Sequence, residues 1–270
     1  MLLMKVIARE GQKYLKMFRL DDRITTNPLL GSPLLMASII AFYLLLSLKW
    51  LPSFMANRKP YKVEGIMKLY NVLQILLNLF VCYDSITTIL NMPDYSFTCQ
   101  RCERDDRRPE TMRFARCAIF YYSLKYFDMF DTIFFLLRKK FRQVTFLHVY
   151  HHSIMIFGTF AYCAVLFGSH FTSTGVINSF IHVVMYTYYL IAAMKPNIDL
   201  KPLKKTLTRM QLIQFILLGI HFSFPLVNNW CKLNTFWLWI AYTQNFFMIM
   251  LFLNFYYKAY VRNSNKNKIK

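Results

Sequence analysis

Long apolar segments alternate with short polar ones along almost the whole chain. A helix of about 20 residues spans the roughly 30 Å of hydrocarbon in a bilayer, and several segments reach that length. They lie at 30–51, 66–90, 114–137, 144–167, 174–194, 210–230 and 234–257. Lipid offers no partner to an unpaired backbone group, so each segment should be a helix. The pattern predicts an all-α polytopic membrane protein with seven transmembrane helices, arranged as a single domain over 1–270.

The composition agrees with a membrane setting. Hydrophobic residues make up 56% of the chain, which is high for a soluble domain. The net charge of +20 would also suit a nucleic-acid binder. However, the basic residues fall in short clusters between apolar segments, and no zinc, glycine-rich or RNA-binding motif accompanies them. We therefore expect membrane lipid, and no nucleic acid, as a partner. Residues 1–28 are too charged to contain the apolar core of a signal peptide.

The distribution of Lys and Arg predicts an orientation. The connections at 52–65, 138–143 and 195–209, together with the tail at 258–270, are richer in these residues than the opposite side. The positive-inside rule then places the C-terminus in the cytosol and the segment 1–29 on the other side. Lys266 and Lys268 form a K-x-K-x-x ending, the pattern of a dilysine signal. This ending predicts retrieval to the endoplasmic reticulum membrane.

Three cysteines lie on the predicted non-cytosolic side. Cys99 and Cys102 fall in the loop 91–113, and Cys231 falls in the loop 228–233. That compartment is oxidising enough for a disulfide. One bond from Cys231 to either loop cysteine is expected.

The fourth apolar segment carries three histidines on one helical face. His148, His151 and His152 follow helical spacings of three and four residues. Ionisable side chains at membrane depth are rare and mark working sites by default. We interpret this face as a reaction centre.

The third apolar segment carries a second polar stripe. Lys125, Asp128, Asp131 and Thr132 lie at offsets 0, 3, 6 and 7, on one side of a helix. Unpaired in hydrocarbon, each charge would cost several kcal/mol. Facing the histidines, the stripe could orient imidazoles and set their basicity. The alternative is a structural ion pair between helices.

Two more polar stripes follow. On the fifth segment Asn178, His182 and Tyr186 share a face, and on the sixth Thr208, Gln211 and Gln214 do so. All these stripes lie mid-membrane or toward the predicted cytosolic side, where a charged, soluble co-substrate can arrive.

Other protein classes also place histidines in membrane helices. Histidine-box desaturases and hydroxylases use H-x-x-H-H, but they need more histidine ligands than the six in this chain. Two of the six are unsuited, because His170 lies in a non-cytosolic loop and His221 lies alone on the sixth segment. A non-enzymatic seven-helix transporter or receptor is the other alternative, although no broken helices or repeat halves are visible.

At these residues the sequence resembles the ELO family, the fatty acid elongases of very-long-chain lipid synthesis, and looks like an insect member. The resemblance covers nearly the whole chain. It rests on K-x-x-[E/D]-x-x-D-T at 125–132, L-L-R-K-K at 136–140, the histidine box at 148–152, N-S-F-x-H-x-x-M-Y-x-Y-Y at 178–189, T-x-x-Q-x-x-Q at 208–214 and L-N-F-Y at 253–256. Asp128 stands where most members have Glu.

The resemblance implies a fold and an activity. Six helices would surround a closed-ended acyl tunnel, with the first helix outside. The protein would be an acyltransferase, a very-long-chain 3-oxoacyl-CoA synthase. It would join a long-chain acyl-CoA with malonyl-CoA to give a 3-oxoacyl-CoA two carbons longer, CoA and carbon dioxide. No bound metal or redox cofactor is expected. The ketoacyl reductase, dehydratase and enoyl reductase of the elongation cycle are expected partners, and a homo-oligomer is compatible.

The resemblance also implies roles for the polar residues. His151 and His182 match the family histidines placed against the thioester carbon, and imidazole is the strongest nucleophile available on the inward faces. His148 and His152 would orient these rings. Supporting or substrate-binding residues would be Lys125, Asp128, Asp131, Thr132, Asn178, Tyr186, Gln211 and Gln214.

Two further expectations concern the non-cytosolic end. The family's loop context favours Cys99 over Cys102 as the partner of Cys231. Phe167, Phe222 and Trp230 are candidates for the tunnel floor, with Trp230 better explained as an interfacial anchor.

Overall fold

The computed structural model describes residues 20–23, 30, 32–101, 103–194 and 197–262, and this part of the chain is helical without strands. The first helix, α2, continues through a π-helical turn (Leu46–Trp50) into the short α3. The helices are α2 (Pro33–Leu45), α3 (Leu51–Met55), α4 (Glu64–Leu90), α5 (Pro109–Phe127), α6 (Phe130–Leu137), α7 (Phe146–Val165), α8 (Thr172–Ala193), α9 (Lys201–Val227) and α10 (Thr235–Tyr256). Short helical turns follow α6 and α10, at Phe141–Gln143 and Tyr257–Arg262.

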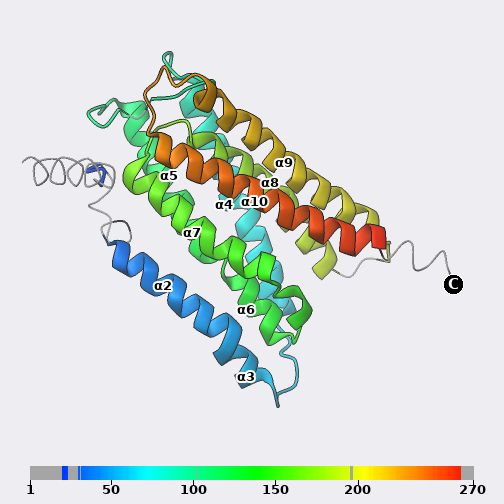
Figure 1. Ribbon diagram of the computed structural model, residues 1–270. Helices are drawn as coiled ribbons and strands as arrows, with labels where there is room; N and C mark the ends of the chain where they lie inside the picture. The colour runs from blue at the N-terminus through cyan, green and yellow to red at the C-terminus, as the bar shows by residue number, and fades with distance from the viewer. Residues whose placement is uncertain (1–19, 24–29, 31, 102, 195–196, 263–270) are drawn as a thin grey trace, which may run out of the picture.

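The described helices run back and forth along one bundle (Figure 1). Five stretches are long and apolar enough to cross a membrane: Pro33–Met55, Glu64–Leu90, Thr172–Ala193, Lys201–Val227 and Thr235–Arg262. The two remaining passes are made by α5 with α6 and by α7. These passes carry the charged stripe and the histidine face, whose polar side chains lower the hydropathy. The predicted fold class, an all-helical polytopic membrane protein, is confirmed.

Six of the passes surround the interior, and the first lies outside them. Neighbouring helices pack in the order α7, α5, α4, α8, α9 and α10. Helix α2 packs against α7 from outside, and α3 packs against α6 (Figure 1). The first pass is therefore peripheral.

The predicted third helix is wrong in one respect, because it is broken in the middle. Helix α5 ends at Phe127 and α6 begins at Phe130. Across the break the backbone bonds tighten to a spacing of three, from Asp131 N to Asp128 O (3.3 Å) and from Thr132 N to Met129 O (3.1 Å). The Phe127 carbonyl accepts a hydrogen bond from the Tyr70 hydroxyl at 3.0 Å. A side chain from α4 thus satisfies a backbone group at the break, as burial in a membrane requires.

The two ends of the bundle differ in chemistry. One, which we call the disulfide end, holds the loops 91–108, 166–171 and 228–234. There Cys99 and Cys231, the predicted pair, are joined by a disulfide with Cα atoms 5.7 Å apart. The other, which we call the basic end, holds 56–63, 138–145, 197–200 and Tyr257–Arg262. Cys102, Lys266 and Lys268 lie outside the described residues.

His221 is the only histidine of α9, as predicted, but it has a histidine neighbour from outside that helix. Its ring stacks on that of His170, with centroids 3.6 Å apart. His170 Nε2 donates to His221 O at 2.9 Å, and His221 Nε2 lies 3.1 Å from His170 O. The pair joins the α7–α8 loop to α9 at the disulfide end. Sequence spacing could not reveal it, because 51 residues separate the two rings.

Candidate functional site

Two cavities meet inside the bundle beside the histidines. The first, of about 530 Å³, lies toward the basic end and is lined by many polar groups; we call it the polar chamber. The second, of about 660 Å³, extends toward the disulfide end and is mostly apolar; we call it the apolar chamber. His151, Asn178 and Gln214 line both chambers and so mark their junction.

His148 is held at its backbone by Thr145 and at its ring by Thr132, which Tyr43 contacts in turn. Thr145 caps α7, its side chain accepting a hydrogen bond from His148 N at 3.2 Å. Thr132 Oγ1 lies 2.8 Å from His148 Nε2, and the Tyr43 hydroxyl of α2 lies 2.8 Å from the same oxygen. Because its Nε2 is already engaged, His148 is better suited to positioning than to nucleophilic attack.

His151 has the opposite environment. Its imidazole has no hydrogen-bond partner among the residues that the structure describes, and it faces both chambers. The ring of His152 lies beside it, with centroids 5.5 Å apart, and His152 also stacks edge-on to His148 at 4.4 Å. Of the three box histidines, His151 has the ring nitrogen most open to a substrate.

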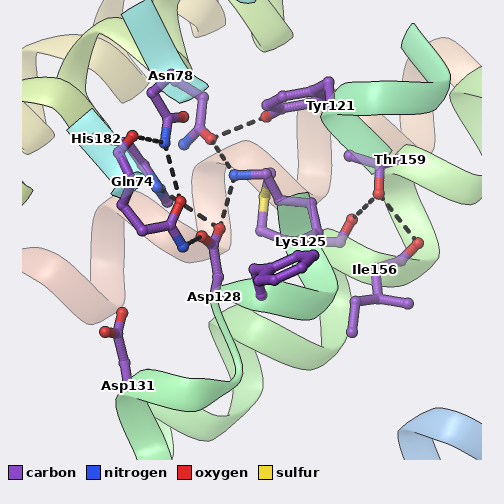
Figure 2. Close-up of polar contacts among 12 residues, drawn as sticks. Gln74, Asn78, Tyr121, Lys125, Asp128, Asp131, Ile156, Thr159 and His182 are labelled. Carbon is purple, nitrogen blue, oxygen red and sulfur yellow. Dashed lines mark hydrogen bonds and ion pairs between the residues drawn. The ribbon is translucent and has the colours of Figure 1, made fainter. Parts of the chain in front are cut away.

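The helix break brings a buried ion pair to the opposite wall (Figure 2). Lys125 Nζ donates to Asp128 Oδ2 at 2.8 Å and to Asn178 Oδ1 at 3.1 Å. His182 Nδ1 lies 3.6 Å from the same Asp128 oxygen. Asn178 Oδ1 also accepts from the Tyr121 hydroxyl at 2.8 Å. Lys125 therefore orients both a carboxylate beside His182 and an amide at the junction.

The second Asp128 oxygen is held from α4 and α8. Gln74 Nε2 donates to Asp128 Oδ1 at 2.9 Å, and the Tyr186 hydroxyl lies 3.1 Å from it. The same hydroxyl lies 2.9 Å from Asp131 Oδ2, so Tyr186 bridges the two carboxyl groups. Asp128 thus has partners at both oxygens, as a buried charge requires.

The structure brings the predicted site residues together in two layers. Those that line the polar chamber are Asp131, His148, His151, His152, Asn178, His182, Gln211 and Gln214. Behind them lie Lys125, Asp128, Thr132 and Tyr186, all buried. Gln211 Nε2 contacts Met185 Sδ at 3.9 Å. Gln214 Oε1 is buried at the junction and has no hydrogen-bond partner in the part of the chain that the structure describes.

Sequence reasoning missed several residues of the site. Asn71, Gln74 and Asn78 lie at offsets 0, 3 and 7 on α4, and all three are buried. That spacing is the same signal that identified the other stripes, so these residues could have been found. Tyr43 gave no such signal, because it is a single tyrosine in an apolar helix. The basic residues at the mouth of the polar chamber were also not assigned a role: Arg138, Lys140, Arg142 and Lys204.

The candidate floor residues have different positions. Phe222 lines the apolar chamber at the disulfide end, together with Leu166, Phe171 and Trp237. Phe167 is fully buried but packs against Phe114 and under the Arg23 guanidinium, away from the chamber. Trp230 is 58% exposed, as an interfacial anchor would be. Only Phe222 of the three is placed to form a floor.

Fold and site together define a multi-pass membrane protein with a histidine-lined interior. Residues 28–268 match the model of the ELO family, described as the GNS1/SUR4 family. The chain is 36% identical to very long chain fatty acid elongase 1 of Homo sapiens, over 90% of this chain and 87% of that protein. It is 35% identical to very long chain fatty acid elongase 7 of Drosophila melanogaster, over 92% and 75%, and 38% identical to human very long chain fatty acid elongase 4, over 89% and 76%. The chain belongs to the GNS1/SUR4 family.

Proposed function

We propose that this chain is the condensing enzyme of a fatty acid elongation cycle, a 3-oxoacyl-CoA synthase. It joins a long-chain acyl-CoA with malonyl-CoA and releases CoA and carbon dioxide. The elongase names of its relatives support the pathway, and they imply acyl-CoA substrates in a membrane. The observation that carries the chemistry is the position of His151 at the junction of a polar and an apolar chamber, where its imidazole has no hydrogen-bond partner among the described residues.

The two chambers suit the two halves of an acyl-CoA. An acyl chain fits the apolar chamber, whose walls are aliphatic and aromatic. The phosphates of CoA fit the basic entrance of the polar chamber, because guanidinium and ammonium groups recognise phosphate. This entrance is formed by Arg138, Lys140, Arg142 and Lys204. With the two parts so placed, the thioester lies at the junction, against His151.

We propose a covalent route. A ring nitrogen of His151 attacks the thioester carbon, the carbon–sulfur bond breaks, and CoA leaves as the thiolate to give an acyl-imidazolium. Malonyl-CoA then loses carbon dioxide, and the resulting enolate carbon attacks the acyl carbon and frees the imidazole. Asn178 accepts from Lys125 and Tyr121 at its oxygen, which leaves its Nδ2 to donate to the developing oxyanion. Tyr186 acts indirectly, by bridging Asp128 and Asp131.

His182 has a distinct proposed role. Its Nδ1 faces the Asp128 carboxylate, so its Nε2 can polarise the carbonyl or take part as a second nucleophile. His148 and His152 position the box, and His148 is itself held through Thr132. No metal or redox cofactor has a step in this scheme.

The orientation in the membrane, the cellular location and the partner enzymes follow from the same proposal. The basic end would face the cytosol, where soluble CoA esters arrive, and the chain would reside in the endoplasmic reticulum membrane with its C-terminus cytosolic. The reductases and dehydratase that complete each elongation cycle would be its partners.

The test is to incubate purified enzyme with palmitoyl-CoA and no malonyl-CoA. The covalent route predicts release of one CoA per active site and an acyl mass on the peptide carrying His151. A His151→Ala variant should lose this release and lower turnover by about 10³-fold or more. His148→Ala, which leaves the nucleophile in place, should still form some adduct.

The rival route is direct attack of the malonyl carbanion on bound acyl-CoA, with histidine only as a base. It predicts no CoA release until malonyl-CoA is added. Active enzyme that releases no CoA and carries no adduct would overturn the covalent assignment. Failure to extend any acyl-CoA by two carbons, alongside introduction of a double bond or hydroxyl group, would overturn the condensing function itself.

A further inference from the structure

The apolar chamber has one wall that reaches the outer surface of the bundle. Helices α7 and α10 frame the side that faces the viewer in Figure 1, with α4 and α8 behind them. Several residues of these two helices line the chamber and are also classed as exposed. They are Phe157 and Gly158 on α7, and Thr243, Phe246 and Phe247 on α10. The chamber therefore has a lateral mouth between α7 and α10.

The packing around the ring is weakest at this seam. Every other pair of neighbouring helices in the ring packs closely, whereas α7 and α10 have few contacts with one another. A side chain added at Gly158 would meet no atom within 4 Å, so open space lies directly in front of this position. On the opposite side of the same chamber, a side chain at Gly175 would meet the Tyr121 ring at 3.5 Å.

One polar contact between α7 and α10 marks the edge of the mouth that is nearest to the histidines. The Tyr150 hydroxyl donates to Gln244 Oε1 at 2.6 Å, joining α7 to α10. The Tyr150 ring also packs edge-on to Phe247, with centroids 5.2 Å apart. All three side chains line the apolar chamber. The contact separates the mouth from the basic entrance used by a charged headgroup.

The level of this mouth within the bilayer determines what can pass through it. Gly158 lies near the middle of α7, about 10 Å along the helix from His151, and hence within the hydrocarbon layer. Only an apolar chain can cross there without losing hydration. The alternative path, end-on through the polar chamber, takes the same chain past Arg138, Lys140, Asp131 and the histidines. Burying an apolar chain beside polar groups that lose their water is unfavourable.

We propose that the acyl chain enters and leaves the apolar chamber sideways, from the bilayer, through the mouth between α7 and α10. The CoA headgroup meanwhile stays at the basic end. This inference rests on the proposed function and adds the route of the substrate. It adds a lateral opening between α7 and α10 to the closed-ended tunnel that the family resemblance implies.

The test attaches a removable plug at the mouth. The Gly158→Cys variant, in proteoliposomes, is modified with a benzyl methanethiosulfonate, which adds an apolar group through a disulfide. Gly65→Cys is the matched control, since Gly65 is an exposed helical glycine on α4 that also has open space in front of it. Unsubstituted protein treated identically accounts for reaction at Cys82, Cys117 and Cys163. The readout is the time course of CoA release from palmitoyl-CoA alone.

The plug should slow CoA release by about tenfold or more in Gly158→Cys, with an unchanged final amount, and reduction should restore the rate. Octanoyl-CoA, short enough to enter from the basic end, should be slowed much less. An unchanged rate would overturn the proposal. So would a lower final amount, because that means the plug fills the chamber instead of blocking its entrance. Absence of CoA release from the unmodified enzyme is a different result, which refutes the covalent route; the mouth is then judged from the rate of malonyl-dependent elongation.

Discussion

At the scale of the residue, the site depends on an ion pair whose two members are both buried. Lys125 and Asp128 are each about 2% exposed, and their Nζ and Oδ2 atoms lie 2.8 Å apart. Such a pair gains little over an apolar pair, but removing one partner leaves a charge without compensation. The pair therefore serves mainly to orient its neighbours, Asn178 and His182.

Changing one partner should be worse than changing both. Lys125→Met should lower the free energy of unfolding by about 3–5 kcal/mol, and Lys125→Met with Asp128→Leu should recover part of that loss. Neither variant should elongate acyl-CoA at a normal rate, because Asn178 and His182 lose their orientation in both. Denaturant unfolding in detergent and turnover in membranes are the measurements. Glu103→Gln is the control, since its pair with Arg101 is exposed and should contribute about 0.5 kcal/mol or less. A double variant as unstable as the single one would contradict this account.

At the scale of the element, the α7–α8 loop is fastened to α9 by the stacked imidazoles of His170 and His221. Burial, with a smaller effect of His221 beside it, lowers the pKa of His170 from 6.5 to about 4. The folded protein therefore excludes a proton that the unfolded chain binds below pH 6.5. The stabilisation is complete above pH 6.5 and is lost progressively as the pH falls toward 4.

We expect the thermal unfolding midpoint to fall between pH 7 and pH 5, and His170→Gln to flatten this dependence. Replacement should also lower the midpoint at pH 7, because the stacked ring and its hydrogen bond to His221 O are lost. Asp94 and Asp106, whose pKa values the Arg108 guanidinium lowers, stabilise the fold above their unfolded pKa near 4 and lose that effect only at lower pH. They do not account for a change between pH 7 and pH 5. An equal slope in His170→Gln and unsubstituted protein would show that another group titrates.

At the scale of the whole molecule, three helices and a loop together set the depth of the apolar chamber. His151 on α7 and Leu166, the C-cap of that helix, are 15 residues apart, which corresponds to about 22 Å along the helix. The far end is closed by Leu166 and Phe171 of the α7–α8 loop, Phe222 of α9 and Trp237 of α10. The disulfide between Cys99 and Cys231 ties the loops at this end, and a closure of this length stabilises by a few kcal/mol.

Opening the far end should lengthen the products. Phe222→Ala should shift the product profile to longer acyl chains, whereas Phe167→Ala should leave it unchanged, because Phe167 packs outside the chamber. Both substitutions remove a buried phenyl ring and should cost about 3–5 kcal/mol, so Phe167→Ala controls for destabilisation. Gas chromatography of the products from a panel of acyl-CoAs is the measurement. Equal profiles for the two variants would contradict the assignment of Phe222 to the floor.

The sequence by itself determined the membrane helices and most of the polar stripes. Both are local properties: about 20 apolar residues suffice for a span, and spacings of three and four place His148, His151 and His152 on one face. The family motifs also carried the Cys99–Cys231 pairing. The tertiary structure alone decided which stripes face each other. It broke the third helix after Phe127, brought Tyr43 from the peripheral helix to Thr132, and stacked His221 on His170. It also placed His151 at the junction of two chambers and left a mouth between α7 and α10. These features depend on how side chains from distant segments pack, and no local pattern along the chain encodes that.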